Sequence, residues 1–130
     1  MGRLCVFDPD DFLNVARKII GSDYEKVEAV MRTAVSRAYY SSFLACKQFA
    51  ISQGEINLKQ YDRADHPRHG EVHRAVRDAL MEVDRSDAAS FLYDLSSRRV
   101  VADYKILETV NKNDAIEAIE LSLKIKQQIQ

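Results

Sequence analysis

The sequence predicts an all-α fold, an up-and-down bundle of about five helices that forms a single domain over residues 1–130. Glycine and proline are scarce, with four and two copies in 130 residues, which favours long helices with short connections over a β fold. Apolar residues recur at helical spacing along most of the chain. With 46% hydrophobic residues, a chain of this length can bury one core.

Two helices are predicted in the first half of the chain. The first is capped by Asp8, which is followed by a proline that suits the first helical position, and it stops at Gly21. The second opens with a capping box formed by Ser22 and Glu25 and continues to Gln53. This second helix is the longest predicted element.

Three more helices follow a predicted loop over residues 55–68. The third spans residues 69–84, where apolar residues follow the helical period closely. The fourth spans residues 86–109 and begins with a serine cap. The fifth is capped by Asn111 or Asn113 and runs to the C-terminus.

Charge and composition exclude several classes of partner. Nineteen basic and twenty acidic residues give a net charge of -1, so no overall electrostatic attraction to DNA or to an anionic membrane is expected, and any RNA contact must be local. The two cysteines, Cys5 and Cys46, are too few for a disulfide framework and lack metal-type spacing. The chain has neither a long apolar run nor a signal-peptide pattern, so we expect a cytoplasmic protein.

The second predicted helix has polar and aromatic residues on the side that faces away from its main apolar stripe. Ser36, Tyr40 and Phe43 fall on this side, with Arg32 and Tyr39 at its edge. An exposed aromatic face marks an interface or a pocket. We therefore expect Tyr39 and Phe43 at a homodimer interface or ligand surface, unless another helix of the chain, such as the first, covers them. The opposite stripe is expected in the core: Val27, Met31, Ala34, Ala38, Ala45 and Phe49.

The fourth predicted helix places charges where its apolar side should continue. Ser96, Arg99 and Asp103 extend the line that Leu95 belongs to, whereas Arg98 lies off it and is expected to point outward or across a dimer interface. Arg99 and Asp103 are four residues apart and can form a solvated pair worth a few tenths of a kcal/mol. If the pair is buried, it suggests a site at the end of the bundle or between two chains.

Histidines cluster around the start of the third predicted helix. His69 and His73 lie on or beside its apolar face, and His66 precedes it. This spacing can suit a metal ion, but no acidic or cysteine partner accompanies the histidines, so we predict neither a metal nor a cofactor. Packing, capping or contact with a substrate or phosphate are the alternatives. No phosphate-binding glycine loop, nucleophile elbow or Cys/His pair is present, which disfavours most familiar enzyme classes.

Two segments resemble signatures of a known family. Residues 36–43, Ser-Arg-Ala-Tyr-Tyr-Ser-Ser-Phe, followed by Ala45, resemble the second-helix signature of the HEPN superfamily, the nucleotide-binding domain of higher eukaryotes and prokaryotes. Residues 99–104, Arg-Val-Val-Ala-Asp-Tyr, resemble the R-x-x-A-D-Y signature of one uncharacterised prokaryotic branch. The start of the third helix, residues 69–72, is also similar. The resemblance extends over residues 10–129.

The resemblance implies a helical bundle that dimerises and is often encoded beside a minimal nucleotidyltransferase as a toxin–antitoxin pair. Active members are metal-independent RNases with an arginine, four to six further residues and then a histidine. The arginine stabilises phosphate charge and the histidine moves a proton. Counting from Arg98 places Asp103 where that histidine would be, and counting from Arg99 gives the A-D-Y variant. An aspartate is normally ionised at neutral pH and repels phosphate.

The sequence therefore favours a homodimeric nucleotide- or RNA-binding module that acts with a nucleotidyltransferase. We expect Arg99 to anchor a phosphate and Tyr40 to stack or hydrogen-bond, with Arg37, His69 and Tyr104 as further ligand-binding residues.

Two alternatives remain open at this point. One is a divergent ribonuclease in which Asp103 acts as the base and Arg98 or Arg99 supports the transition state. The other is a purely structural interaction module, in which the charged residues only join helices.

Overall fold

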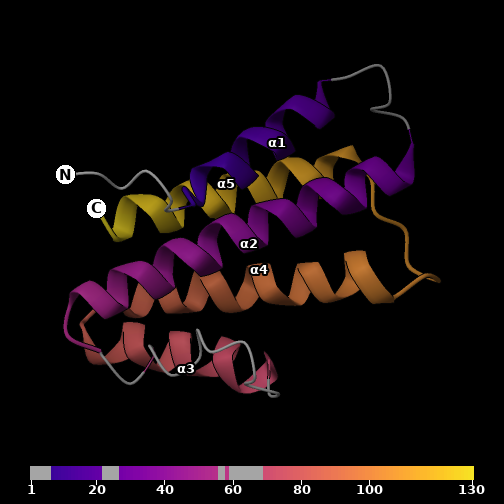
Figure 1. Ribbon diagram of the computed structural model, residues 1–130. Coiled ribbons are helices and arrows are strands. Elements are labelled where there is room, and N and C mark those ends of the chain that lie inside the picture. The colour runs from indigo at the N-terminus through magenta and orange to yellow at the C-terminus, as the bar shows by residue number, and fades with distance from the viewer. Residues whose placement is uncertain (1–6, 22–26, 56–57, 59–68) are drawn as a thin grey trace.

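In a computed structural model, the chain folds into an all-α helical bundle (Figure 1). The structure describes residues 7–21, 27–55, 58 and 69–130. Within those ranges it has no strand, and none of its helices is long and apolar enough to cross a membrane. The helices are α1 (Asp10–Ile20), α2 (Glu28–Ser52), α3 (His69–Glu82), α4 (Ser86–Tyr104) and α5 (Lys112–Gln128).

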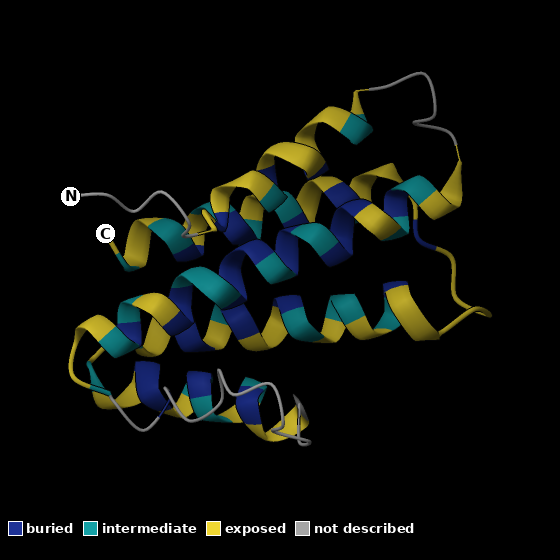
Figure 2. Cartoon of the chain, viewed as in Figure 1, coloured by how far each residue is buried: buried dark blue, intermediate teal, exposed yellow. Residues whose placement is uncertain are grey.

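The long helix α2 occupies the centre of the bundle. It packs against all four other helices, with α1 and α5 on one side and α3 on the other (Figure 1). Among the described residues, α3 contacts only α2 and α4. Figure 2 shows buried positions along most of α2. Because neighbours surround α2, it buries polar residues such as Ser36, Ser41 and Ser42 as well as apolar ones.

The predicted core stripe of α2 is confirmed in its middle part. The residue that departs from the prediction is Val27, which is 48% exposed because it precedes the first turn as the N-cap. The stripe divides into the buried Met31, Ala34 and Ala38 and the partly buried Ala45 and Phe49.

The predicted end of α1 is confirmed, but its predicted start is one residue early, because Pro9 is the N-cap and Asp10 the first helical residue, and the N-cap itself has no side-chain hydrogen bond. The Asp8 carboxylate accepts a 3.0 Å hydrogen bond from the backbone N–H of Asp10, and Gly21 forms the C-cap. The stop at Gly21 is a local signal, so the sequence is sufficient to predict it.

The predicted start of the second helix is wrong, because α2 begins at Glu28 after Val27, whose backbone is extended. The predicted capping box of Ser22 and Glu25 itself lies outside the described residues.

The start of α5 also follows a local signal. Asn111 is the N-cap, and its side chain accepts a 3.0 Å bond from the N–H of Asp114, whose carboxylate accepts a 2.9 Å bond in return. Asn111 is therefore the cap rather than Asn113. The predicted serine cap of α4 is wrong, because Ser86 is the first helical residue, the N-cap is Arg85, and no side chain caps this end.

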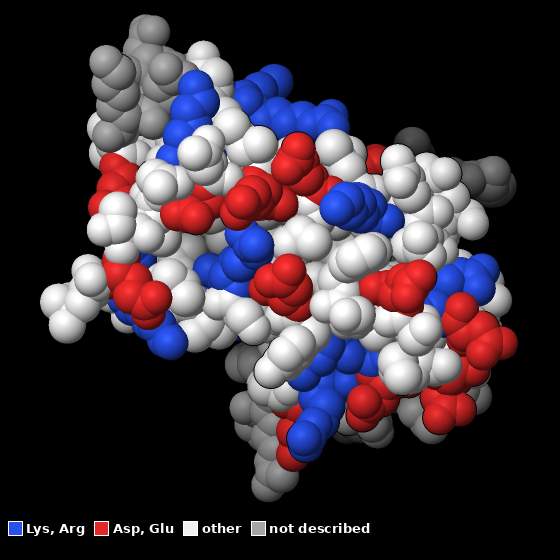
Figure 3. Space-filling model, turned by 180° about the vertical axis from the view of Figure 1, so that it is seen from behind, with Lys and Arg blue, Asp and Glu red and all other residues white. Residues whose placement is uncertain are grey.

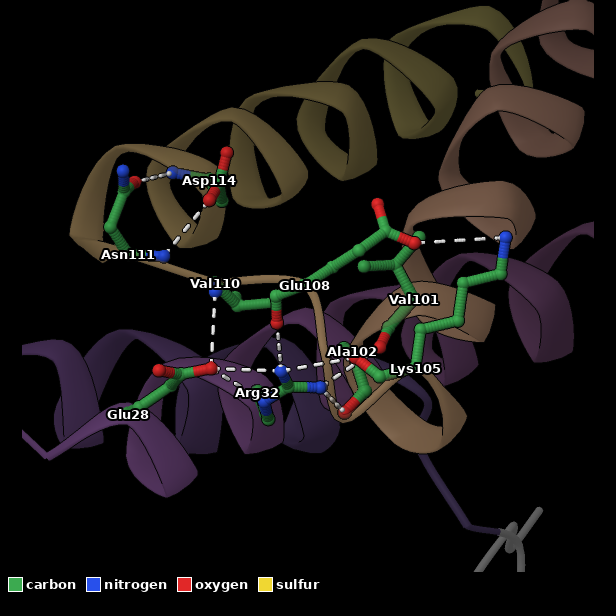
Figure 4. Close-up of polar contacts among 9 residues, drawn as sticks. All are labelled: Glu28, Arg32, Val101, Ala102, Lys105, Glu108, Val110, Asn111 and Asp114. Atoms are coloured by element: carbon green, nitrogen blue, oxygen red, sulfur yellow. Dashed lines mark hydrogen bonds and ion pairs between the residues drawn. The ribbon is translucent and has the colours of Figure 1, made fainter.

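The end of α4 differs from the prediction, because the helix stops at Tyr104 and not near Thr109. At this end the guanidinium of Arg32 on α2 meets the last turn of α4 and the following loop (Figure 4). Glu28 holds this guanidinium with a 2.8 Å ion pair. The guanidinium donates hydrogen bonds to four carbonyl oxygens, those of Val101 (2.9 Å), Ala102 (3.0 Å), Lys105 (3.3 Å) and Glu108.

Charges of both signs are interspersed on the face of the molecule shown in Figure 3. This pattern agrees with the near-balance of acidic and basic residues in the sequence. Any selective attraction of an anion must therefore come from a small group of side chains.

Candidate functional site

Arg99 lies in the last turns of α4, against three tyrosine rings. Its guanidinium carbon is 5.3 Å from the ring centroid of Tyr39, 5.7 Å from that of Tyr40 and 5.8 Å from that of Tyr104. The Arg99 side chain is only 12% exposed. Because the face of each ring attracts a cation, the tyrosines favour this position of the guanidinium.

Arg99 uses only part of its hydrogen-bonding capacity. Its Nη1 donates a long, 3.4 Å bond to Oδ2 of Asp103, one helical turn later. The same carboxylate oxygen accepts a 3.4 Å bond from the hydroxyl of Ser36 on α2. The Nε of Arg99 is buried and has no hydrogen-bond partner within the described part of the chain. A buried donor of this kind is costly and marks a position that deviates from ordinary packing.

The surroundings of Arg99 preserve its positive charge. Burial disfavours the charged guanidinium, but Tyr40, Tyr104 and Asp103 outweigh that effect, so the pKa of Arg99 is raised above its ordinary value. Arg99 is therefore a permanent cation that an anionic ligand can use.

Arg37 adds a second cation beside Tyr40. Its guanidinium carbon is 5.3 Å from the Tyr40 ring and 4.9 Å from the ring of Phe12 on α1, and its Nη2 donates a 3.4 Å bond to Ser36. Arg37 and Arg99 together outnumber the single carboxylate near them. We call this group the Arg99 cluster: Ser36, Arg37, Tyr39, Tyr40, Arg99, Asp103 and Tyr104.

The predicted dimer-interface residues lie inside the chain. Tyr39 is 0% exposed and Phe43 is 6% exposed, so they cannot form the exposed aromatic face that was expected. His73 of α3 covers them, with its ring centroid 5.5 Å from that of Tyr39 and 4.4 Å from that of Phe43. The predicted cover by the first helix applies to Tyr40, whose ring is 6.5 Å from that of Phe12.

The two adjacent arginines of α4 have different surroundings. Arg98 lies at the surface, where its one-third-exposed side chain forms ion pairs with Asp94 at 3.2 Å and with Glu117 of α5 at 2.9 Å. It lines a separate cavity of about 210 Å³ between α2, α4 and the start of α5. Of the two arginines, Arg99 is the one that lies with Asp103 and the tyrosines.

The apolar side of α4 also continues differently from the prediction. Leu95 is buried as expected, but the next buried position is Ala102. Ser96 and Arg99 are partly buried, and Asp103 is exposed, so these residues lie along the margin of the core. A helical-wheel projection of this segment alone could not locate the margin, because the margin depends on where α2 and α3 approach α4.

Of the predicted histidine group, the described part of the site contains His73. The side chain of His69, a predicted ligand-binding residue, and the whole of His66 lie outside the described residues. Sequence reasoning missed that His73 would join the tyrosines, although its place on an apolar helix face was a signal. No group of three or more His, Cys, Asp or Glu residues in the described ranges could hold a metal ion.

The Arg99 cluster thus combines a permanent cation, a second arginine, a carboxylate and an outer aromatic ring, since Tyr104 is 69% exposed. Such a set can bind a phosphate and stack a base. Comparisons with protein-family models, with curated proteins and with solved structures found no match to this chain.

Proposed function

We propose that this chain is a nucleotide- or RNA-binding module of the HEPN type, in which Arg99 anchors a phosphate. The observation that carries the proposal is the guanidinium of Arg99, which is held against three tyrosine rings while its Nη1 makes a long, 3.4 Å hydrogen bond to the carboxylate of Asp103. Arginine binds phosphate through paired N–H donors, and Arg99 has donor capacity to spare. Tyr104, with 69% of its surface exposed, offers a ring on which a base can stack.

The charge balance of the Arg99 cluster supports an anionic ligand. Arg37 and Arg99 both lie against Tyr40, while Asp103 is the one carboxylate among the residues of the cluster. The 3.4 Å contact between Arg99 and Asp103 is long for a charge-assisted hydrogen bond, so a phosphate can compete for the guanidinium. The Tyr40 ring then supports the guanidinium groups of both Arg37 and Arg99, in place of the predicted role of stacking on the ligand.

The adjacent arginines provide a matched test. We would measure fluorescence anisotropy of a labelled single-stranded RNA with wild type, Arg99→Ala and Arg98→Ala. Because Arg99→Ala loses one phosphate contact, it should bind the RNA about tenfold more weakly than wild type. The slope of log K against log salt concentration should become less steep by about one unit. Arg98→Ala, which removes an arginine already paired with Asp94 and Glu117, should retain binding. Equal losses in the two variants would contradict the proposed site.

A divergent ribonuclease is the second candidate, favoured by the position of Asp103. Its Oδ2 lies beside both the Arg99 guanidinium and the Ser36 hydroxyl, so a proton acceptor is close to the phosphate-binding cation. The same RNA, incubated with the protein and a metal chelator, should then be cut by wild type but spared by Arg99→Ala and Asp103→Asn. Cleavage that survives both substitutions would exclude this site, and the complete absence of cleavage favours the binding module.

Homodimerisation is part of the proposal, and the exposed end of α4 supports it. Ile106 and Leu107, just after the helix, are 84% and 96% exposed, and Val100 and Tyr104 are exposed beside them along α4. Exposed apolar groups of this kind favour association. Light scattering at micromolar concentration should give a dimer that Leu107→Asp converts to a monomer. Val15→Asp, which changes an exposed apolar residue of α1, is the control and should leave the dimer intact.

A partnership with a minimal nucleotidyltransferase, in a toxin–antitoxin type system, is proposed from the HEPN-like signatures of α2 and α4. The identity of the neighbouring gene tests it, and co-purification of the two expressed proteins would support it.

A further inference from the structure

Tyr39 connects Arg99 to a third helix. The ring of Tyr39 lies 5.3 Å from the Arg99 guanidinium carbon, and its hydroxyl forms a hydrogen bond with Nδ1 of His73 on α3. The hydroxyl of Ser96 on α4 also hydrogen-bonds the Tyr39 side chain. Tyr39 is 0% exposed, so its hydroxyl depends on these protein partners rather than on water.

Tyr39 is protonated where it meets His73. Burial raises the pKa of Tyr39 to about 12, so the side chain is a neutral phenol at physiological pH and has a proton to donate. The Tyr39 hydroxyl and Nδ1 of His73 share this hydrogen bond, in which the imidazole tautomer sets which of the two donates. The tyrosine hydroxyl is thereby held in one orientation.

The imidazole of His73 is itself held by aromatic rings. Its centroid lies 4.4 Å from that of Phe43 and 6.4 Å from that of Tyr40, the latter edge-on. An uninterrupted series of contacts therefore runs from α3 through Tyr39 on α2 to Arg99 on α4. The other restraints on Arg99 are weaker, because the centroids of Tyr40 and Tyr104 lie farther away, at 5.7 and 5.8 Å, and the contact with the 27% exposed Asp103 is 3.4 Å long.

We propose that His73 is a positioning residue, which orients Tyr39 and thereby holds the guanidinium of Arg99 where it meets a phosphate. The attraction between a cation and a ring depends on the ring's orientation, so a misplaced Tyr39 releases Arg99. The statement about phosphate rests on the proposed function, whereas the statement about Arg99 does not. Helix α4 has no histidine. In this arrangement the imidazole comes from α3 and acts on Arg99 through Tyr39.

The position of Arg99 can be observed without any ligand by NMR. The Nε–Hε signal of Arg99, identified by its loss in Arg99→Lys, should exchange slowly with solvent in wild type because this atom is buried. Tyr39→Phe and His73→Leu should each accelerate the exchange, because both remove the hydrogen bond between the two side chains. His73→Asn, whose amide can accept or donate in place of Nδ1, should restore slow exchange.

Binding of the labelled single-stranded RNA gives the second readout. Tyr39→Phe and His73→Leu should weaken binding by about three- to tenfold, the range for a weakened cation–π contact of a partly buried arginine. In an Arg99→Ala background, the same substitutions should have no further effect, because they act through Arg99. Tyr93→Phe is the control, since Tyr93 also lies against an arginine, Arg77 at 5.2 Å, outside the Arg99 cluster.

The outcomes separate the two proposals. Unchanged Arg99 exchange in folded His73→Leu and Tyr39→Phe proteins would overturn the inference, as would equal binding losses with and without Arg99. If Tyr39→Phe does not fold, the partly exposed His73 position still provides the test. If wild type binds no RNA while His73→Leu accelerates Arg99 exchange and His73→Asn restores it, the positioning role stands and the proposed function fails.

Discussion

The guanidinium of Arg32 donates a 3.0 Å hydrogen bond to the carbonyl oxygen of Ala102, which joins the N-terminal part of α2 to the last turn of α4. The final carbonyls of a helix lack partners within the helix and carry a partial negative charge, so a cation stabilises them. Arg99 and Tyr104 lie in the same two turns. The contact therefore caps the end of α4 that carries Arg99 and Tyr104.

Replacing Arg32 with alanine should lower the free energy of unfolding by about 2 to 3 kcal/mol, because several hydrogen bonds to a charged group are lost at once. Urea denaturation measures this change. Lys105→Ala is the control, since it removes an exposed 3.8 Å ion pair with Glu108 and should cost about 0.5 kcal/mol or less. Similar costs for the two variants would show that Arg32 does not cap α4.

Glu28 should make the stability of the bundle depend on pH. A hydrogen bond from Arg32, and a second from the Val110 N–H, lower the pKa of Glu28 below its reference value of 4.5. Because the folded-state pKa is the lower one, this stabilisation is fully present above about pH 4.5 and is lost as the pH falls through the folded-state value.

Urea midpoints measured from pH 6 down to about pH 3 should therefore fall less steeply for Glu28→Gln than for wild type. Glu120→Gln, on an exposed position of α5, should keep the wild-type slope. A Glu28→Gln protein with unchanged acid sensitivity would contradict the assigned contacts.

Two adjacent serines of α2 should respond to alanine in opposite directions. Both are 0% exposed, but Ser42 donates a 2.7 Å bond to Ser122 of α5, whereas the Ser41 hydroxyl has no hydrogen-bond partner among the described residues. Ser42→Ala leaves Ser122 unpaired and should cost about 1 to 2 kcal/mol. Ser41→Ala removes a buried polar group and improves helix propensity, so it should stabilise the protein by about 0.5 to 1 kcal/mol.

The double variant of Ser42 and Ser122 gives the check on this assignment. Because it removes both partners, the double change should cost less than the sum of the two single changes in urea denaturation. Additive costs would mean that the two hydroxyls do not interact.

Cys46 should be unreactive in the folded protein. Burial raises the pKa of its thiol to about 12, an effect that the charge of Lys126 only partly offsets, so little thiolate exists near neutral pH. In a Cys5→Ser background, a thiol reagent at about pH 8 should label Cys46 only as the bundle opens, and denaturant should make labelling fast. Rapid labelling without denaturant would contradict its burial in the core.

Features with local causes were predictable from the sequence. The stop of α1 at Gly21 and the Asn111 cap of α5 each depend on residues within a few positions of the helix end. The end of α4 was not predictable in this way, because the cap comes from Arg32, which precedes Ala102 by 70 positions. The burial of Tyr39 and Phe43 likewise depends on His73 of α3, which a helical-wheel projection of α2 alone does not include.

Hydrophobic period, composition and short-range capping are enough to predict the all-α class, most of the helix boundaries and the residue types available to a site. Which side chains meet depends on how the helices pack. Because other helices pack on several sides of α2, Tyr39, which was expected at a dimer surface, lies inside the chain against the guanidinium of Arg99. Arg98, the neighbour of Arg99 in the chain, pairs instead with Glu117 of α5. The physical reason is that burial and pairing are long-range properties, set by how helices distant in sequence pack together.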